Sequence, residues 1–155
     1  DDGDLRMHES CAMIQYVMAR YGEGRLQPPV HDSAYAHFLQ WLWFSESTFQ
    51  RPLGEITNHR REFDPELPDV VAEMKGRATQ CVEALDQVLT GRPYLLGDRM
   101  TAADLSNAYV LRGYQRSVTT DLPGNVKSFW DRLSALPSYE RTVKADTAAR
   151  EKLKG

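Results

Sequence analysis

Apolar side chains recur three and four residues apart along most of this chain, and this spacing constrains the fold more than any other pattern in the sequence. One such run passes through Val71, Met74, Ala78, Cys81 and Leu85. Similar runs predict helices over about 33–50, 101–116 and 125–136, with a short helix after Pro137. Asp32 or Ser33 can cap the first of these helices, and Pro52 should kink or end it, whereas Pro68 suits the first turn of the helix that contains Val71. This period gives each helix one apolar stripe. Because no alternating strand pattern follows residue 24, we expect that part of the chain to be all-α.

The first 24 residues have a different pattern. Leu5 and Met7 alternate with polar residues, as in a half-buried strand, and Asp2-Gly3 is typical of a hairpin turn. Ser10 is a suitable N-cap for a helix that closes at Gly22. Since one strand and one helix cannot form a stable sheet layer, we expect residues 1–24 to be the end of a longer domain. The predicted fold is mostly α, with an all-α domain over 25–155.

Composition argues against several classes of function. The 155 residues are 41% hydrophobic and 26% charged, which is ordinary for a soluble globular protein. A net charge of −3 with scattered basic residues gives no reason to expect nucleic acid or an anionic membrane as partner. No apolar run approaches the ~20 residues of a membrane span. The two cysteines fall on separate predicted helices, so we expect no disulfide, no metal site and a cytoplasmic location.

The segment YLLGDRMTAADLSNAYVL, at 94–111, is the most specific stretch of the sequence. Thr101 suits the N-cap of a helix, and Asp104 stands three residues later, where its carboxylate can accept from the Thr101 backbone N–H. The two residues therefore predict a reciprocal capping box. Glu or Gln is more usual at the third position, so the shorter Asp104 predicts a tightly packed, buried helix start.

Four segments together resemble the cytosolic glutathione transferases. YLLGDRMTAADL resembles the capping box that opens their sixth helix, and HESCAMIQYVMARYG resembles the Glu-Ser turn and third helix of their thioredoxin-like domain. YAHFLQWLWFSESTFQRPL is similar to the long fourth helix of bacterial members, and VKSFWDRLSALPSYER to their closing segment. The resemblance implies that residues 1–24 are the last strand and helix of a thioredoxin-like domain. It implies that residues 25–155 are the helical C-terminal domain.

The same resemblance gives Glu9 and Ser10 a role. In the family the matching pair holds the γ-glutamyl end of glutathione, which carries a carboxylate and an ammonium. A helix N-terminus suits the carboxylate, to which the Ser10 N–H and hydroxyl would add, and the Glu9 carboxylate suits the ammonium. Glutathione would be a co-substrate, and no cofactor is expected. From the residues alone, a simple cap at Ser10 and a favourable helix-end charge at Glu9 are the better explanation.

Other candidate residues allow two interpretations. Trp41, Phe44 and Tyr109, with Tyr114, could line an apolar pocket for a substrate, but aromatic residues at helical spacing are more often part of the core. Glu46 on an apolar helix face is better explained as a hydrogen-bonded structural carboxylate than as a functional one. Cys11 is expected to be a packed thiol whose pKa the helix start lowers somewhat.

The function implied by the resemblance is transfer of the glutathione thiolate to a small hydrophobic electrophile. In the family, the Ser, Tyr or Cys that activates the thiol lies near the start of the thioredoxin-like domain, which we place upstream of Asp1. Family members usually form homodimers through their third and fourth helices, which match 11–21 and 33–50. One alternative is a non-catalytic relative that uses the same fold for binding or assembly. Another is a stand-alone helical interaction domain without a small-molecule site.

Overall fold

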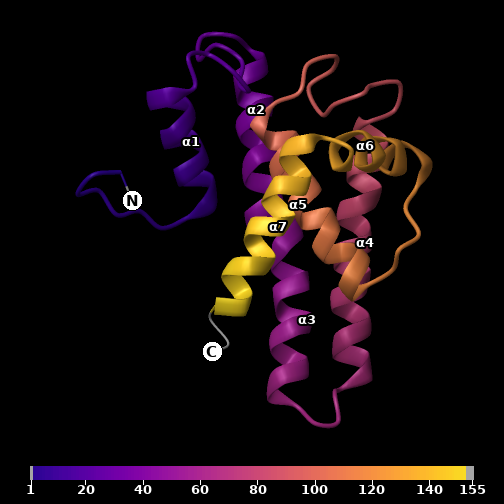
Figure 1. Cartoon of the computed structure of the whole chain (residues 1–155). Helices are drawn as coiled ribbons and strands as arrows, with labels where there is room; N and C mark the ends of the chain where they lie inside the picture. Colours follow the sequence, from indigo (N-terminus) through magenta and orange to yellow (C-terminus); the bar gives the residue numbers. More distant parts are fainter. Residues whose placement is uncertain (1, 153–155) are drawn as a thin grey trace.

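The computed structural model describes residues 2–152, with Arg150 described by its backbone alone. The helices are α1 (Ser10–Tyr21), α2 (Ala34–Trp43), the π-helical turn η1 (Phe44–Phe49), α3 (Gln50–Glu62), α4 (Pro68–Val88), α5 (Ala102–Ser117), α6 (Gly124–Ser134) and α7 (Pro137–Lys152) (Figure 1). Within residues 2–152 there is no β-strand, and two isolated β-bridges join Asp2 to Leu5 and Tyr94 to Gly97. The prediction of an all-α architecture after residue 24 is confirmed over that range.

The strand predicted over residues 5–8 does not form. Instead, Asp2 and Leu5 close a tight turn through two backbone hydrogen bonds of 3.1 Å, with Gly3 at φ 61°, and residues 6–9 follow without regular structure. The turn agrees with the Asp-Gly signal. A lone extended segment leaves its N–H and C=O groups without partners, so alternation alone cannot produce a strand here.

Helix α5 is the centre of the core. Eight of its residues are buried, and it packs against α2, η1, α3 and α6. Outside it, α3 and α4 form a long antiparallel hairpin that extends beyond the other helices (Figure 1). Pro68 occupies the first turn of α4, as predicted, where its missing N–H costs no helical hydrogen bond. The fully buried residues Phe38, Leu42 and Phe49 place α2 and η1 on the same core.

Pro52 does not end the helix in which it lies. The chain runs from α2 through η1 into α3 without a break, and Pro52 is buried in the first turn of α3. A π-helical turn, in which N–H groups reach carbonyls five residues earlier, directly precedes it. The prediction that the helix ends at Pro52 was therefore wrong. The hydrogen-bond register changes before the proline, so Pro52 falls in the first turn of a new α-helical segment.

The predicted capping box at the start of α5 is present. One carboxylate oxygen of Asp104 accepts from the Thr101 N–H (2.7 Å) and hydroxyl (2.9 Å), and the other accepts from the Leu95 N–H (2.8 Å). Asp104 is fully buried, as predicted. Burial raises the pKa of its carboxyl group, although the three donors act in the opposite direction.

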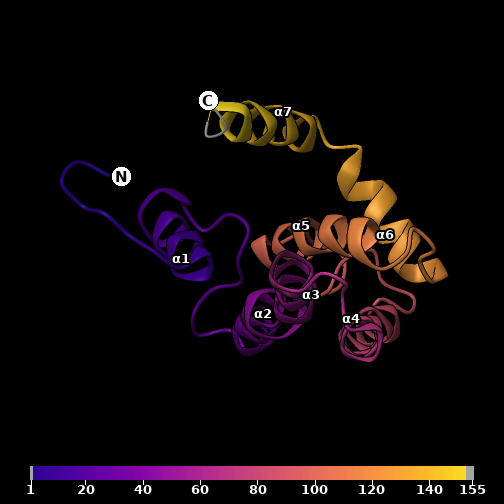
Figure 2. The ribbon, with the colours of Figure 1, turned by 90° about the horizontal axis from the view of Figure 1, so that it is seen from below.

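Two helices lie at the periphery, α1 at one side of the bundle and α7 along another (Figure 2). Helix α1 buries Cys11 and Met18 but leaves a stripe of Met13, Val17 and Tyr21 between 41% and 52% exposed. Helix α7 is longer than predicted and is tied to α5 by Arg112 and Asp146, whose side-chain atoms are 3.3 Å apart. Across the described residues, no helix combines the length and apolar character needed to cross a bilayer.

Candidate functional site

Glu9 and Ser10 lie where the chain enters α1. Glu9 occupies the N-cap position with φ 70° and ψ 108°, a conformation that a non-glycine residue rarely adopts. Ser10 is the first residue of the helix, and the first helical hydrogen bond runs from the Met13 N–H to the Glu9 carbonyl (2.9 Å). Strained backbone of this kind is concentrated at functional sites. The Glu9 side chain is exposed, so its carboxylate is available to a ligand.

The prediction that Ser10 caps this helix was wrong. The N-cap residue is Glu9, and no side chain caps the α1 N-terminus among the described residues. The Ser10 hydroxyl instead donates to Glu46 Oε2 on η1, at 3.0 Å. Because Ser10 already has the helical conformation, its hydroxyl cannot play the part of a cap. The first-turn N–H groups of α1 therefore receive no capping hydrogen bond from a side chain at the N-cap position.

Among the described residues, two hydrogen bonds join the N-terminus of α1 to α2 and η1. Besides the contact between Ser10 and Glu46, the Cys11 thiol donates to the Leu42 carbonyl at 3.4 Å. The interpretation of Glu46 as a hydrogen-bonded carboxylate is confirmed, although its proximity to Ser10 was not predicted. The one indication of this contact in the sequence was the apolar spacing, which places Glu46 on the same helix face as Phe38 and Leu42.

Cys11 is a packed thiol, as predicted, but the expected direction of its pKa shift was wrong. Burial raises the pKa of the Cys11 thiol, and the Glu46 carboxylate raises it further. Burial also raises the pKa of Cys81, and both residues are buried and free. Neither thiol therefore has the depressed pKa of a nucleophile. Among residues 2–152, no three His, Cys, Asp or Glu side chains gather closely enough to hold a metal ion.

The aromatic residues predicted to line an apolar pocket differ in burial. Trp41 and Phe44 are half-buried and pack edge to face, with ring centroids 5.1 Å apart. Tyr109 is 49% exposed on α5, whereas Tyr114 is buried and pairs with the Thr79 hydroxyl at 3.2 Å. Phe44 also lines a hollow of about 490 Å³ between the η1–α3 segment and α4. Tyr114 is thus part of the core, and the substrate role of Trp41, Phe44 and Tyr109 stays a prediction.

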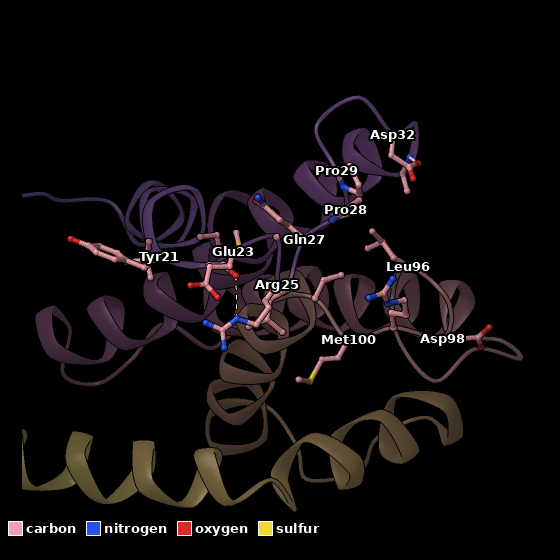
Figure 3. Close-up of a pocket in the computed structure, with 18 residues that line it drawn as sticks. Tyr21, Glu23, Arg25, Gln27, Pro28, Pro29, Asp32, Leu96, Asp98 and Met100 are labelled. Atoms are coloured by element: carbon pink, nitrogen blue, oxygen red, sulfur yellow. Dashed lines mark hydrogen bonds between the residues drawn. The ribbon is translucent and has the colours of Figure 1, made fainter.

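A larger hollow, of about 1190 Å³, lies at the other end of α1. Figure 3 shows its side chains, which come from the end of α1, the linker after it and the loop before α5. Arg25 is held there through its Nε, which donates to the Gly22 carbonyl at 3.2 Å. The hollow includes neither Glu9 nor Ser10, so it is separate from the candidate site.

Comparison with known proteins identifies the family. The family model described as "Glutathione S-transferase, C-terminal domain" matches residues 66–141. Glutathione S-transferase 3 of Zea mays is 30% identical over 156 residues, an alignment that covers 93% of this chain and 68% of that protein. The chain belongs to the glutathione S-transferase family. Glutathione S-transferase hmp2 of Hypomyces subiculosus is 29% identical over 161 residues, covering 97% of this chain and 74% of that one.

Solved structures of glutathione S-transferases share the fold. A glutathione transferase of Phanerochaete chrysosporium, solved with oxidized glutathione, matches with a TM-score of 0.85 at 20% identity, over 97% of this chain and 70% of that one. A glutathione S-transferase of Actinobacillus pleuropneumoniae matches with a TM-score of 0.77 at 24% identity, over 94% of this chain and 66% of that one. The chain thus spans roughly two thirds to three quarters of the length of these family members.

Proposed function

We propose that the protein is a glutathione transferase and that Glu9 and Ser10 hold the γ-glutamyl end of glutathione. The observation that carries the proposal is the start of α1, where an exposed glutamate with positive φ meets an uncapped helix N-terminus. Backbone N–H groups and the positive end of the helix suit the γ-glutamyl carboxylate. The Glu9 carboxylate supplies the opposite charge for the neighbouring ammonium.

The assigned residues bind and orient glutathione rather than activate it. Cys11 and Cys81 have raised thiol pKa values, and we assign no residue of this chain to the glutathione sulfur. The electrophile we propose is small and hydrophobic, and the exposed and half-buried aromatics Trp41, Phe44 and Tyr109 are the candidates for contact with it. The reaction would join the glutathione thiolate to that electrophile.

We further propose that the protein is a homodimer formed through the segments 11–21 and 33–50. Large apolar side chains of both segments face outward: Met13 and Val17 on α1, and Trp43 on α2, with 40–52% of their surface exposed. Aromatic and apolar side chains that gather on a surface favour protein contact. A dimer would cover part of this surface.

Calorimetric titration of the complete protein with glutathione tests the role of Glu9. Each charge-assisted hydrogen bond is worth roughly 1.5–3 kcal/mol, so Glu9→Ala should weaken binding by roughly ten- to a hundred-fold. Glu23→Ala is the matched control, because Glu23 is also an exposed glutamate with positive φ (49°), at the opposite end of α1. We expect it to bind glutathione as the wild type does.

The result that would contradict the proposal is equal affinity of wild type and Glu9→Ala for glutathione. Glu9 would then be only a charge at a helix end. A complete protein that binds glutathione but conjugates it to no electrophile would instead favour a non-catalytic binding module.

A further inference from the structure

The π-helical turn η1 lies directly behind the N-terminus of α1. The Phe44 N–H donates to the Gln40 carbonyl, four residues earlier, whereas the Gln50 N–H donates to the Ser45 carbonyl, five residues earlier. The hydrogen-bond register therefore changes within this turn, and such turns inside α-helices are frequent at functional sites. Both acceptors that hold α1 belong to this region, the Leu42 carbonyl and the Glu46 carboxylate.

Side chains hydrogen-bond to the backbone just before the turn. Three successive carbonyls, those of residues 41 to 43, each accept from at least one side chain: Asn107 Nδ2 to Trp41 (2.8 Å), Ser45 Oγ to Leu42 (2.6 Å), Cys11 Sγ to Leu42 (3.4 Å) and Ser47 Oγ to Trp43 (2.7 Å). Side-chain donors of this kind compete with the helical ladder and bend it. The change of register is therefore supported by specific side chains.

Two of these donors, Ser45 and Asn107, are completely buried. The Asn107 amide nitrogen bridges the Trp41 carbonyl of α2 and the Ala103 carbonyl of α5 (2.9 Å). Two carbonyl neighbours fix the amide orientation, since only the NH₂ group can donate. The Asn107 Oδ1 is buried without a hydrogen-bond partner among the described residues. Burying an unpartnered amide oxygen costs free energy, which an apolar residue would avoid. We therefore interpret Asn107 as a residue whose NH₂ group is needed to donate to the two carbonyls.

We propose that Ser45 and Asn107 are positioning residues for the γ-glutamyl site. They hold the carbonyls of Leu42 and Trp41, and thereby fix the turn that presents Glu46 to Ser10 and Leu42 to Cys11. Neither residue touches the ligand; both act through the placement of the α1 N-terminus. The inference rests on the proposed function, because it takes that N-terminus to be the glutathione site.

The test compares Ser45→Ala with Ser106→Ala in the complete protein. The Ser106 hydroxyl lies 2.6 Å from the Ser45 hydroxyl, so its removal also deletes a hydroxyl contact there, but the bond from Ser45 to Leu42 remains. Loss of one hydrogen bond behind the site should raise the glutathione dissociation constant roughly three- to ten-fold in Ser45→Ala. Ser106→Ala should bind as the wild type does. Asn107→Leu, which removes the bridge between α2 and α5, should act in the same direction as Ser45→Ala.

Amide exchange of Met13, measured without ligand, gives a second readout. Its N–H makes the first hydrogen bond of α1, and we expect faster exchange in Ser45→Ala but not in Ser106→Ala. Unchanged exchange together with unchanged glutathione affinity in Ser45→Ala would overturn the inference. If the wild type does not bind glutathione, the proposed function fails, and Met13 exchange alone then decides whether Ser45 positions α1.

Discussion

At the scale of single residues, Glu9 carries most of the functional argument. The sequence placed a carboxylate and a hydroxyl together at the start of a helix, and the structure contains both there. The left-handed conformation of Glu9 could not be predicted, because positive φ is signalled by Gly or Asn and the residue is neither. For the same reason we predicted the N-cap of α1 at Ser10, one residue after its actual position at Glu9. The carboxylate that accepts from the Ser10 hydroxyl, Glu46, lies 36 residues further along the chain and becomes a neighbour only through folding.

Asp104 shows the opposite case, in which a local motif determines the structure. Its carboxylate accepts three hydrogen bonds within the segment 95–104 and is fully buried. Asp104→Ala leaves the N–H groups of Leu95 and Thr101 without acceptors, so we expect a loss of about 2–4 kcal/mol in the free energy of unfolding. Asp98→Ala, at an exposed site in the same loop, is the control and should change stability by less than about 0.5 kcal/mol.

The pH dependence of that loss has a defined sign. The native Asp104 carboxyl has a pKa above the ordinary 3.8, so the native state binds its proton more readily than the unfolded chain does. Ionisation of Asp104 therefore lowers the stability of the wild type as the pH rises from about 3.8 through the raised pKa. The difference in unfolding free energy between wild type and Asp104→Ala should narrow over that pH interval in denaturant titrations.

An unchanged thermal midpoint in Asp104→Ala would contradict the structural role of the capping box.

At the scale of elements, the sequence predicted those helices whose ends are marked by local chemistry. Pro68 begins α4, and Thr101 with Asp104 begins α5, because a proline or a capping box acts within one turn. At the start of α2 the N-cap position is Ser33, whose side chain makes no cap hydrogen bond, and the neighbouring Asp32 accepts from the Ala34 N–H at 2.9 Å. These signals need no information from distant parts of the chain.

Two elements were not predictable in this way. The strand expected near residue 5 needed a partner strand, which an alternating pattern cannot supply. The turn η1 depends on donors from three parts of the chain, namely Cys11, Asn107 and its own serines. Pro52 was one local sign of irregularity, and the hydroxyl-rich run 45–48 before it, whose side chains can bond to the backbone, was another.

At the scale of the whole molecule, exposed apolar side chains on α1 and α2 predict self-association. Trp43 is 40% exposed on α2 and lies in a segment we assign to the dimer interface. Sedimentation of the complete protein at micromolar concentration should give a dimer, and Trp43→Glu should shift it toward monomer, because a charge is costly in a buried interface. Phe63→Glu, at an exposed position in the connection between α3 and α4, should leave the dimer intact. A wild-type monomer would refute the assignment.

The family-model match over residues 66–141 and the buried helical core do not include Glu9. The proposed recognition of the γ-glutamyl group by the start of α1 therefore needs its own test. The contact to be tested is the one between the Glu9 carboxylate and the α-ammonium of glutathione.

The most direct measurement is a binding cycle with two proteins and two ligands. Wild type and Glu9→Ala are each titrated with glutathione and with an analogue that lacks the α-amino group of its γ-glutamyl residue. If Glu9 binds the ammonium, the analogue should bind the wild type roughly ten- to a hundred-fold more weakly than glutathione does, and Glu9→Ala should bind both ligands with nearly equal affinity. The same loss in both proteins would mean that Glu9 and the ammonium do not interact, and it would contradict the account.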